Sequence, residues 1–508
     1  MSRTIYTLTL PVETPECARY FFERAFFALS RVHNAAVSHA IGRLNVLKHD
    51  SEYIYLKSEY GELSAKDNLS PAETKLKKKI GRAMNKRIKT AGLTKGDIEK
   101  YTKVIGKKYA KILSSQQVQK ETDRVWTAVE KVLYSNGKQL HYKQLNDFDT
   151  ISGKSNTNGI KFDSKTLMFS WMDNTYYCKI PRTMSIEYLL ESLERKISYC
   201  DLKRIMFPNG WKYYLVVTLA GTSPLVHKHD DKGIMGLDIG TSTVAGASKG
   251  KLYLEILARG VERYEAEISR LNRKMDSSRR LTNPDHYNPD GTYKKGSKGK
   301  LVFSKNYLKL KRRLKSLNRQ RSAFIECAHR KLANEMIRHS VHFVVEKMNF
   351  QSLAKRARET KREAKPKLII DKKGVTRFTR KYAKKKRYGH SILSRAPSLF
   401  VNILEKKACQ YGGELSRVNT TKFRASQYNH VTDTYTPAGR SVREKQIGDT
   451  TVQRDLYSAF LLSNSDGSLE HADREQCSAG FAHFVELHRK LIAEMKASGI
   501  SRKSCFGF

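Results

Sequence analysis

A short apolar run that ends in one carboxylate and then turns sharply is the feature that most limits how this chain can fold. Residues 236–243 read GLDIGTST and continue an apolar run that begins at Ile234. This pattern predicts a buried strand that presents Asp238 at its end. The glycines beside Asp238 would let a second strand or a substrate backbone come close. An acid placed there can hold a metal ion, although an Asp near a strand end more often caps a turn.

Two further acids occupy comparable positions. Residues 342–349, HFVVEKMN, are again an apolar run that ends in an acid, so Glu346 is expected at the tip of a neighbouring strand. In residues 453–461, QRDLYSAFL, the apolar spacing predicts that Asp455 begins a helix packed on the sheet. Three carboxylates at one point repel each other unless cations neutralise them. Magnesium takes oxygen ligands, and two such ions can hold the attacking water and the leaving oxygen of a phosphodiester.

At these acids the chain resembles the RuvC nuclease domain, which has an RNase H-like fold, and more narrowly the TnpB proteins of insertion sequences and the compact type V CRISPR effectors. In that family the first acid lies in a G-hydrophobic-D-x-G block, matched by residues 236–240, and the second ends an apolar-apolar-E block, matched by 344–346. The third begins a D-x-x-x-A helix, matched by Asp455 and Ala459. The motifs are short, and their order and spacing make the combination specific.

The resemblance implies that Asp238, Glu346 and Asp455 are the catalytic and metal-binding residues of a metal-dependent DNA endonuclease. It implies two Mg²⁺ ions, with Mn²⁺ as a substitute, of which Asp238 bridges both and the other acids each complete one site. It also implies a guide RNA, from a CRISPR array or a transposon end, and a double-stranded DNA target beside a short motif. We expect a prokaryotic, cytoplasmic, nucleoid-associated protein; a monomer is favoured, and the oligomeric state is left open.

The charge of the chain points to a polyanionic partner. The 508 residues include 96 Lys and Arg against 50 Asp and Glu, which gives a formal net charge of +46. Nucleic acid binds such surfaces largely through the release of counterions. Membrane surfaces also attract basic proteins, but no stretch reaches about 18 consecutive apolar residues and no signal peptide pattern begins the chain. The composition therefore predicts a soluble, intracellular protein that binds nucleic acid and no membrane.

The cysteines exclude a disulfide framework and a zinc ribbon. They are odd in number and widely spread, and no C-x-x-C pair exists to supply sulfur ligands. We therefore expect free thiols and no zinc. The seven are Cys17, Cys178, Cys200, Cys327, Cys409, Cys477 and Cys505.

The first 150 residues read as one strand followed by charged helices. Residues 4–11 alternate and are rich in β-formers, and residues 14–47 carry an apolar stripe at helical spacing. A capping box from Ser70 to Glu73 begins a basic helix over 75–91. Its charges form either a solvated face or a surface that follows phosphates. Under the second interpretation the contacting residues include Lys78, Arg82 and Lys86.

Residues 159–219 change to a strand-rich pattern. We expect strands over 161–172 and 176–180, a helix over 185–196, and a hairpin that joins 204–207 to 211–219. With the first strand they would complete one sheet, so the helical region is an insertion. In the family these parts are a wedge barrel and a recognition lobe, which we expect to read the adjacent motif. Residues 221–233 are then a linker.

Between the first two acids the sequence predicts strands over 246–257 and two long basic helices between 261 and 338, joined by a polar loop at 277–300. This pair resembles the bridge-like helices that hold RNA against the RuvC domain in family members, and it would bind a nucleic-acid backbone. Its expected contacts are Lys309, Arg312, Arg313 and Arg319.

A dense basic run at 351–387 follows the second acid. We interpret it as a lid over the active site, with a disordered basic segment as the alternative. Arg356 and Arg377 are its expected nucleic-acid contacts. A helix over 398–411 and a strand over 414–418 complete the region.

The chain departs from the TnpB pattern before the third acid. That family usually carries two C-x-x-C pairs there, whereas residues 421–452 contain no cysteine. His430 alone is expected to be a packing or surface residue. The ribbon would therefore rest on packing without zinc, which puts its role in loading target DNA in doubt. The tail contains a predicted helix over 481–497.

The predicted fold is multidomain α+β: a split wedge β-barrel with an inserted helical recognition lobe, followed by an RNase H-like (RuvC) α/β nuclease domain. The barrel comprises residues 1–12 and 151–225, with the helical lobe at 13–150. The nuclease domain comprises 226–420 and 453–508, with the degenerate ribbon at 421–452.

The predicted function is RNA-guided cleavage of DNA by two-metal phosphodiester hydrolysis. A nuclease-inactive RNA-guided repressor on the same scaffold is one alternative, although all three acids are present. An RNA-independent transposase or junction resolvase is another, which explains the acids and the charge but explains the split barrel poorly.

Overall fold

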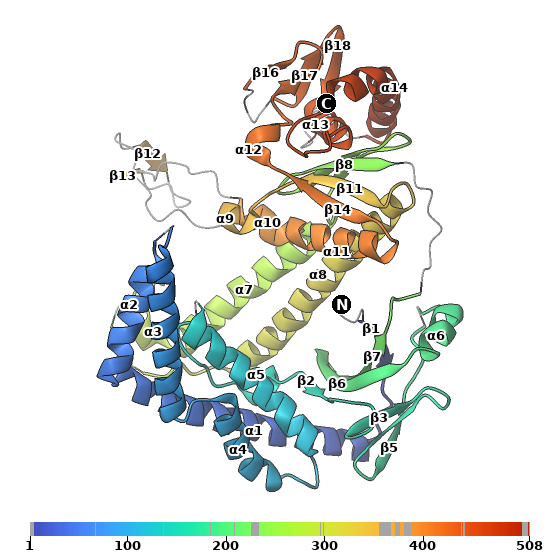
Figure 1. Ribbon diagram of the computed structural model, residues 1–508. Helices are drawn as coiled ribbons and strands as arrows, with labels where there is room; N and C mark the ends of the chain where they lie inside the picture. Colours follow the sequence, from blue (N-terminus) through green and yellow to red (C-terminus); the bar gives the residue numbers. More distant parts are fainter. Residues whose placement is uncertain are drawn as a thin grey trace. The chain divides into compact units, whose positions relative to one another are not determined.

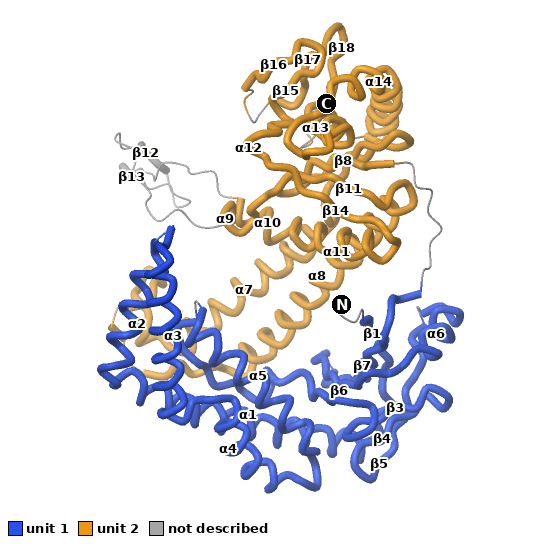
Figure 2. The backbone as a smooth tube through the Cα atoms, in the orientation of Figure 1, with its two compact units in different colours: residues 1–224 blue, residues 225–508 orange. Residues whose placement is uncertain are grey.

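The chain divides into two compact units, Met1–Pro224 and Leu225–Phe508, shown in blue and orange in Figure 2. Each unit has its own sheets and its own hydrophobic cores. The computed structural model describes residues 5–66, 68–135, 137–182, 184–207, 209–224, 233–294, 296–297, 299–354, 367–370, 376–379, 388–437, 439, 442–499 and 506.

The first unit is built on a four-stranded antiparallel sheet in the order β1-β7-β6-β2 (Figure 1). β1 pairs with β7, with Leu8 opposite Val217, although helices α1 to α5 lie between them in the sequence. The strand expected at 4–11 and the hairpin expected over 204–219 are present, and the helical region is an insertion. The strands are β1 (Ile5–Pro11), β2 (Thr150–Ser152), β6 (Ile197–Phe207) and β7 (Gly210–Ala220).

Among the described residues these strands do not close into a barrel, so the predicted β-barrel is wrong in this respect. A separate three-stranded sheet packs on the first through aromatic residues and one backbone bridge between Val12 and Cys178. The strand expected at 161–172 is two strands, because Asp163 accepts a hydrogen bond from the Thr166 hydroxyl within a tight turn. The strands are β3 (Ile160–Asp163), β4 (Met168–Trp171) and β5 (Asn174–Tyr177), followed by helix α6 (Ile186–Leu193).

Helices form most of the rest of the first unit. The Ser70 hydroxyl accepts a hydrogen bond from the Glu73 amide, and the Glu73 carboxylate accepts one from the Ser70 amide, so the predicted capping box is confirmed. α1 runs through two cores, packing Phe22 with the sheet and Val37 with the other helices. The helices are α1 (Glu16–Lys48), α2 (Ser51–Ser64), α3 (Pro71–Thr90), α4 (Lys95–Lys107), α5 (Ser115–Tyr134) and the single turn η1 (Leu145–Asp147).

The second unit is built on a five-stranded mixed sheet in the order β10-β9-β8-β11-β14. β10, β9 and β8 are antiparallel neighbours, whereas β8, β11 and β14 run parallel. The two acid-bearing runs therefore form adjacent parallel strands at the centre of the sheet. The strands are β8 (Ile234–Ile239), β9 (Thr243–Ala247), β10 (Leu252–Ile256), β11 (His342–Glu346) and β14 (Glu414–Val418).

Helices cover both faces of this sheet (Figure 1). Ala459 of α13 shares a core with Val344, and Phe400 of α11 shares the core on the opposite face with Val345. α13 approaches β8 closely at Gly236, where an added Cβ would lie 2.1 Å from the carbonyl oxygen of Ala459. These helices are α9 (Phe350–Ala354), α10 (Gly389–Arg395), α11 (Pro397–Gln410), α12 (Thr420–Phe423), α13 (Arg454–Ser463) and α14 (Arg474–Ala497).

The two long basic helices are present as an antiparallel pair (Figure 1). Arg313 pairs with Glu267 at 2.9 Å, and Arg321 pairs with Glu265 at 3.4 Å, so residue numbers rise along one helix as they fall along the other. The helices are α7 (Glu262–Thr282) and α8 (Lys305–Ile337), with the turn η2 (Pro284–His286) in the loop between them.

Among the residues that the structure describes, the region expected to be a zinc-free ribbon contains two antiparallel pairs of short strands. His430 within it is buried, its Nδ1 lies 2.7 Å from the Tyr457 hydroxyl, and its ring packs against Phe460 and Phe481. Of the two roles expected for His430, a surface or a packing residue, the structure shows packing. The strands are β15 (Tyr428–Asn429), β16 (Thr434–Tyr435), β17 (Glu444–Ile447) and β18 (Thr450–Gln453).

Parts of two predicted segments lie outside the described residues: 225–232 of the linker, and most of the lid at 351–387. Within the lid, β12 (Lys367–Ile370) and β13 (Thr376–Thr379) form an antiparallel hairpin. Of the helices that the structure describes, none combines the length and the apolar character needed to cross a bilayer.

Candidate active site

Asp238 lies near the carboxyl end of the central strand β8. Its neighbours Leu237 and Ile239 point into the core beneath α11, so alternation places Asp238 on the face that α13 covers. The sequence folds this way because apolar side chains on both sides of the acid must be buried. The strand therefore holds one ionisable group in an otherwise apolar layer.

Glu346 is the last residue of β11 and lies beside Asp238. The parallel register pairs Val345 with Leu237, so the next residue of each strand is an acid. Val344 faces the core beneath α13, and Glu346, two residues on, shares that face. The carboxyl ends of neighbouring parallel strands form the edge where α/β sheets bind ligands.

Asp455 reaches the same edge from the first turn of α13. The helix begins here because the Gln453 side chain caps it, accepting a hydrogen bond from the Leu456 amide at 2.7 Å. The close approach at Gly236 sets the position of α13 on β8. The three acids predicted from sequence are thus brought together from three elements.

The carboxylates repel each other. Burial raises the pKa of Asp238 well above its usual range, and the charges of Asp455 and Glu346 raise it further, while Arg454 and Arg443 oppose the shift. Burial also raises the pKa of Glu346. The positive charge near these carboxylates is therefore too small to offset their burial and mutual repulsion. A divalent cation would supply the missing positive charge.

Two arginines that sequence reasoning missed contact the third acid. Arg443 Nη1 donates to Asp455 Oδ2 at 2.8 Å, and Arg454 Nη2 donates to Oδ1 at 3.2 Å. Gln453 Nε2 also donates to Oδ2, at 3.3 Å. Arg454 could have been noticed because it directly precedes the acid. Arg443 gave no such signal, since the β17–β18 hairpin brings it back over the helix start.

The donor chemistry of the site fits a hard divalent cation, since all three groups are carboxylates that share one sheet edge. In the part of the chain that the structure describes, however, no three acid, histidine or cysteine side chains are grouped closely enough to hold one metal ion. Asp238 and Glu346 make no ion pair with any residue that the structure describes. Asp455 would have to exchange its arginine partners to bind the ion.

The predicted nucleic-acid contacts are placed unequally. Lys78, Arg82 and Lys86 form one exposed stripe on α3, at intervals of one helical turn. On α8, Lys309 and Arg312 are exposed. Two other contacts on α8 are less free, because Arg313 pairs with Glu267 and Arg319 is half-buried. Arg356 lies outside the described residues, as does the side chain of Arg377, whose backbone belongs to β13.

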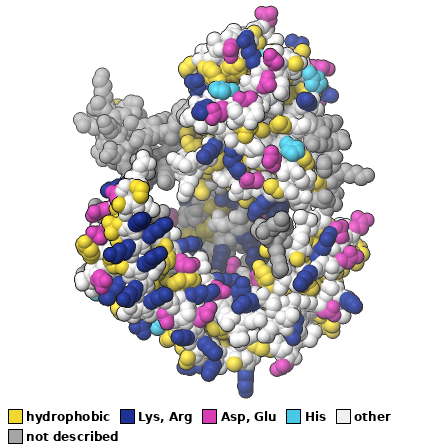
Figure 3. All heavy atoms as spheres, in the orientation of Figure 1, with side chains coloured by type: hydrophobic (Ala, Val, Ile, Leu, Met, Phe, Trp, Pro, Cys, Tyr) yellow, Lys and Arg dark blue, Asp and Glu magenta, His cyan; other side chains and the backbone are white. Residues whose placement is uncertain are grey.

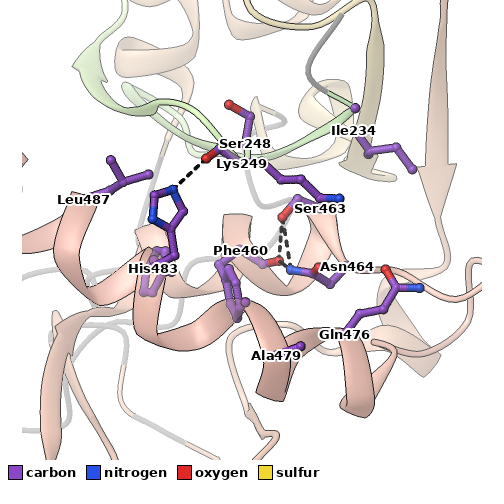
Figure 4. A pocket seen from close by; sticks show the side chains of 13 residues that line it. Ile234, Ser248, Lys249, Phe460, Ser463, Asn464, Gln476, Ala479, His483 and Leu487 are labelled. Atoms are coloured by element: carbon purple, nitrogen blue, oxygen red, sulfur yellow. Dashed lines mark hydrogen bonds between the residues drawn. The ribbon is translucent and has the colours of Figure 1, made fainter.

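A larger cavity of about 590 Å³ lies elsewhere in the second unit (Figure 4). It opens beside Ile234, at the amino end of β8, and Phe460, Ser463 and His483 help to line it. None of the three acids lines it. The candidate active site is therefore at the other end of the strand.

No protein-family model matches the chain, and no curated protein matches it. A solved structure described as "Cryo-EM structure of the Cas12f1-sgRNA-target DNA complex" aligns with 12% identity and a TM-score of 0.47, covering 91% of this chain and 99% of that chain. Another, "Cryo-EM structure of CRISPR-Cas12f Ternary Complex", aligns with 12% identity and a TM-score of 0.24, covering 88% and 82%. Both TM-scores are below one half, which is too low to establish a common fold.

Proposed function

We propose that this chain is an RNA-guided DNA endonuclease of the class that includes TnpB and the compact type V effectors, with a RuvC-like active site. The observation that carries the proposal is the meeting of Asp238, Glu346 and Asp455 at one edge of the sheet. The strand order, with three antiparallel strands followed by two parallel ones, supports an RNase H-like domain.

In the proposed reaction a water attacks the scissile phosphorus in line with the departing 3′ oxygen, so that a new P–O bond forms as the P–O3′ bond breaks. Asp238, Glu346 and Asp455 would hold two Mg²⁺ ions, which supply neutralising charge and lower the pKa of bound water. Arg443 and Arg454 place positive charge beside Asp455 and lower the pKa of Asp238, and once released from Asp455 they would offset part of the charge of the phosphate. No side-chain nucleophile is required.

The basic surface supports a guide RNA as the partner that selects the target. Base pairing would select the sequence, while the protein follows phosphates and reads only a short motif beside the target. The exposed stripes on α3 and α8 suit that role because their charges lie along one helical face. On the face shown in Figure 3, Lys and Arg side chains are dense over the helices of the first unit.

One observation favours a second candidate, a guide-directed DNA-binding protein that does not cut. The carboxylate of Asp455 is paired with two guanidinium groups, which compete with a metal ion for its oxygens in this arrangement. If that pairing persisted in the complex with DNA, the third ligand would be missing and binding would proceed without cleavage.

The test is to purify the chain with its flanking non-coding RNA and to incubate it in Mg²⁺ with a plasmid library that carries randomised sequence beside the target. We expect cleavage by the wild type and none by Asp238→Ala. Cleavage by both proteins would exclude the proposed site. Binding without cleavage by both would favour the second candidate, and cleavage of branched DNA by an RNA-free preparation would indicate a resolvase.

A further inference from the structure

A small cavity of about 160 Å³ adjoins the candidate active site on the side opposite α13. Glu346 forms part of its wall, together with Ile239 at the end of β8. The remaining wall comes from β11 and the segment after it, from α11 and from β14. Glu346 therefore takes part both in the acid cluster and in this neighbouring cavity.

The cavity has an apolar floor and a polar mouth. Val345 and Phe350 are buried beneath it, and Met348 is 38% exposed along its side. At the mouth the amide of Asn402 is exposed, and it has no hydrogen-bond partner among the residues that the structure describes. A side-chain amide can donate and accept hydrogen bonds at the same time, and the edge of a nucleobase offers both acceptors and donors.

The charges at the mouth disfavour a phosphate inside the cavity. Arg417, the cation that borders it, donates two hydrogen bonds to Glu405 at 2.9 and 2.8 Å, so its charge is already compensated. Glu346 adds negative charge on the other side. A neutral, flat group that offers an apolar face and a polar edge suits these walls better.

The volume limits the occupant to a small group. A water molecule occupies about 30 Å³ of liquid, so the cavity has room for roughly five waters, which is too little for a whole nucleotide. An unpaired base could lie with its face against Met348 and Phe350 and its edge at Asn402. Aromatic side chains such as Phe350 stack on bases of any sequence.

We propose that this cavity seats the base of a nucleotide next to the scissile phosphate, in a strand that is unpaired at the cut. With the base held beside Glu346, the scissile phosphate would be positioned at the three acids. Asn402 is then a positioning residue that reads the base edge. This inference rests on the proposed nuclease function.

The test uses the full chain loaded with its guide and a series of targets, each with one abasic nucleotide at a different position around the mapped cut. We expect an abasic nucleotide at one position beside the cut to slow cleavage about tenfold, because the stacked base is lost. Asn402→Ala should slow cleavage of the intact target and show a smaller abasic penalty at that position only.

The control is Cys409→Ala, an exposed neutral substitution on the same helix, which should cut every target as the wild type does. Should Asn402→Ala fold poorly, Ser398→Ala probes the same mouth. The cavity assignment would be wrong if the wild type cut every abasic target at the normal rate. It would also be wrong if Asn402→Ala and Ser398→Ala both kept the full abasic effect of the wild type. Neither outcome would affect the nuclease proposal. A wild type that leaves intact target uncut would overturn the nuclease proposal and this inference with it.

A second readout does not depend on cleavage. In the uncut complex of Asp238→Asn, 2-aminopurine at the sensitive position should lose fluorescence as it stacks in the cavity, and the same base elsewhere should not. An unchanged signal at every position would contradict the assignment.

Discussion

At the scale of single residues, Asp238 combines burial with repulsion, and this has a consequence for stability. A carboxyl whose folded-state pKa is raised holds its proton more tightly in the folded chain than in the unfolded one. Stability is therefore lost as the pH rises from the ordinary pKa of Asp, about 3.9, through the raised value. At neutral pH Asp238 therefore costs stability unless a cation is bound.

Asp238→Asn should accordingly unfold at a higher temperature than the wild type at neutral pH in EDTA, by about 2 °C or more. The difference should shrink as the pH is lowered and when Mg²⁺ is added, because each restores neutrality to the wild-type site. Thermal unfolding followed by circular dichroism measures this. Asp449→Asn, an exposed turn position, is the control and should change little. A lower unfolding temperature for Asp238→Asn would contradict this account of the site.

The acids could be predicted from sequence because their positions follow local patterns. Asp238 and Glu346 each end an apolar run, and Asp455 begins a helix with apolar residues at helical spacing. Their arginine partners could not. Arg443 is 12 residues from Asp455, and its contact depends on how the β17–β18 hairpin folds back. No periodicity in the sequence encodes that return.

At the scale of elements, the contact between β8 and α13 positions the site. In Gly236→Ala the new Cβ would meet the Ala459 carbonyl oxygen and the Ser463 amide nitrogen, at 2.1 and 2.3 Å. Both are backbone atoms, so the helix itself must move and carry Asp455 with it. We expect a loss of about 2 kcal/mol in unfolding free energy, together with slower cleavage.

Chemical denaturation and cleavage assays measure these two effects. The control is Gly467→Ala, where nothing lies within 4 Å of the added Cβ. Equal stability and equal cleavage of Gly236→Ala and the wild type would show that this close approach does not position the acid.

Two adjacent arginines on α8 allow a matched test of whether its exposed basic side chains bind RNA. Arg312 is exposed and makes no ion pair with any residue that the structure describes, whereas Arg313, beside it, pairs with Glu267. Arg312→Ala should weaken guide RNA binding. It should also reduce the magnitude of the slope of log K against log salt concentration by about one, because one phosphate contact is lost. Arg313→Ala should do so less. Binding measured across a salt series distinguishes the two, and identical effects would contradict this ranking.

Local patterns in the sequence predicted which segments are helices and which are strands. They did not predict which strands pair with each other. The strands, the capping box at Ser70 and the long basic helices were predictable. The barrel was not, because closure depends on whether distant edges meet. β2 has only three residues, and among the described residues the β3–β5 sheet joins its neighbour through an isolated bridge between Val12 and Cys178 rather than a continuous ladder.

At the scale of the whole molecule, the net charge of +46 opposes compaction of the free chain. We therefore expect the chain to purify with bound RNA and to unfold at a lower temperature after ribonuclease treatment. Absorbance at 260 and 280 nm and a thermal scan before and after treatment check this. A preparation free of nucleic acid that is equally stable would show that the excess charge needs no polyanion.

The central claim is that Glu346 and its two partner acids form one cutting site at the carboxyl edge of the sheet. The most direct test is the rate of target cleavage in Mg²⁺ by guide-loaded Glu346→Gln and Glu414→Gln. The second glutamate is exposed and lies opposite His342, at the other end of the same parallel pair of strands. We predict a loss of about a hundredfold or more for Glu346→Gln and a wild-type rate for Glu414→Gln. Equal rates for the two variants would contradict the claim.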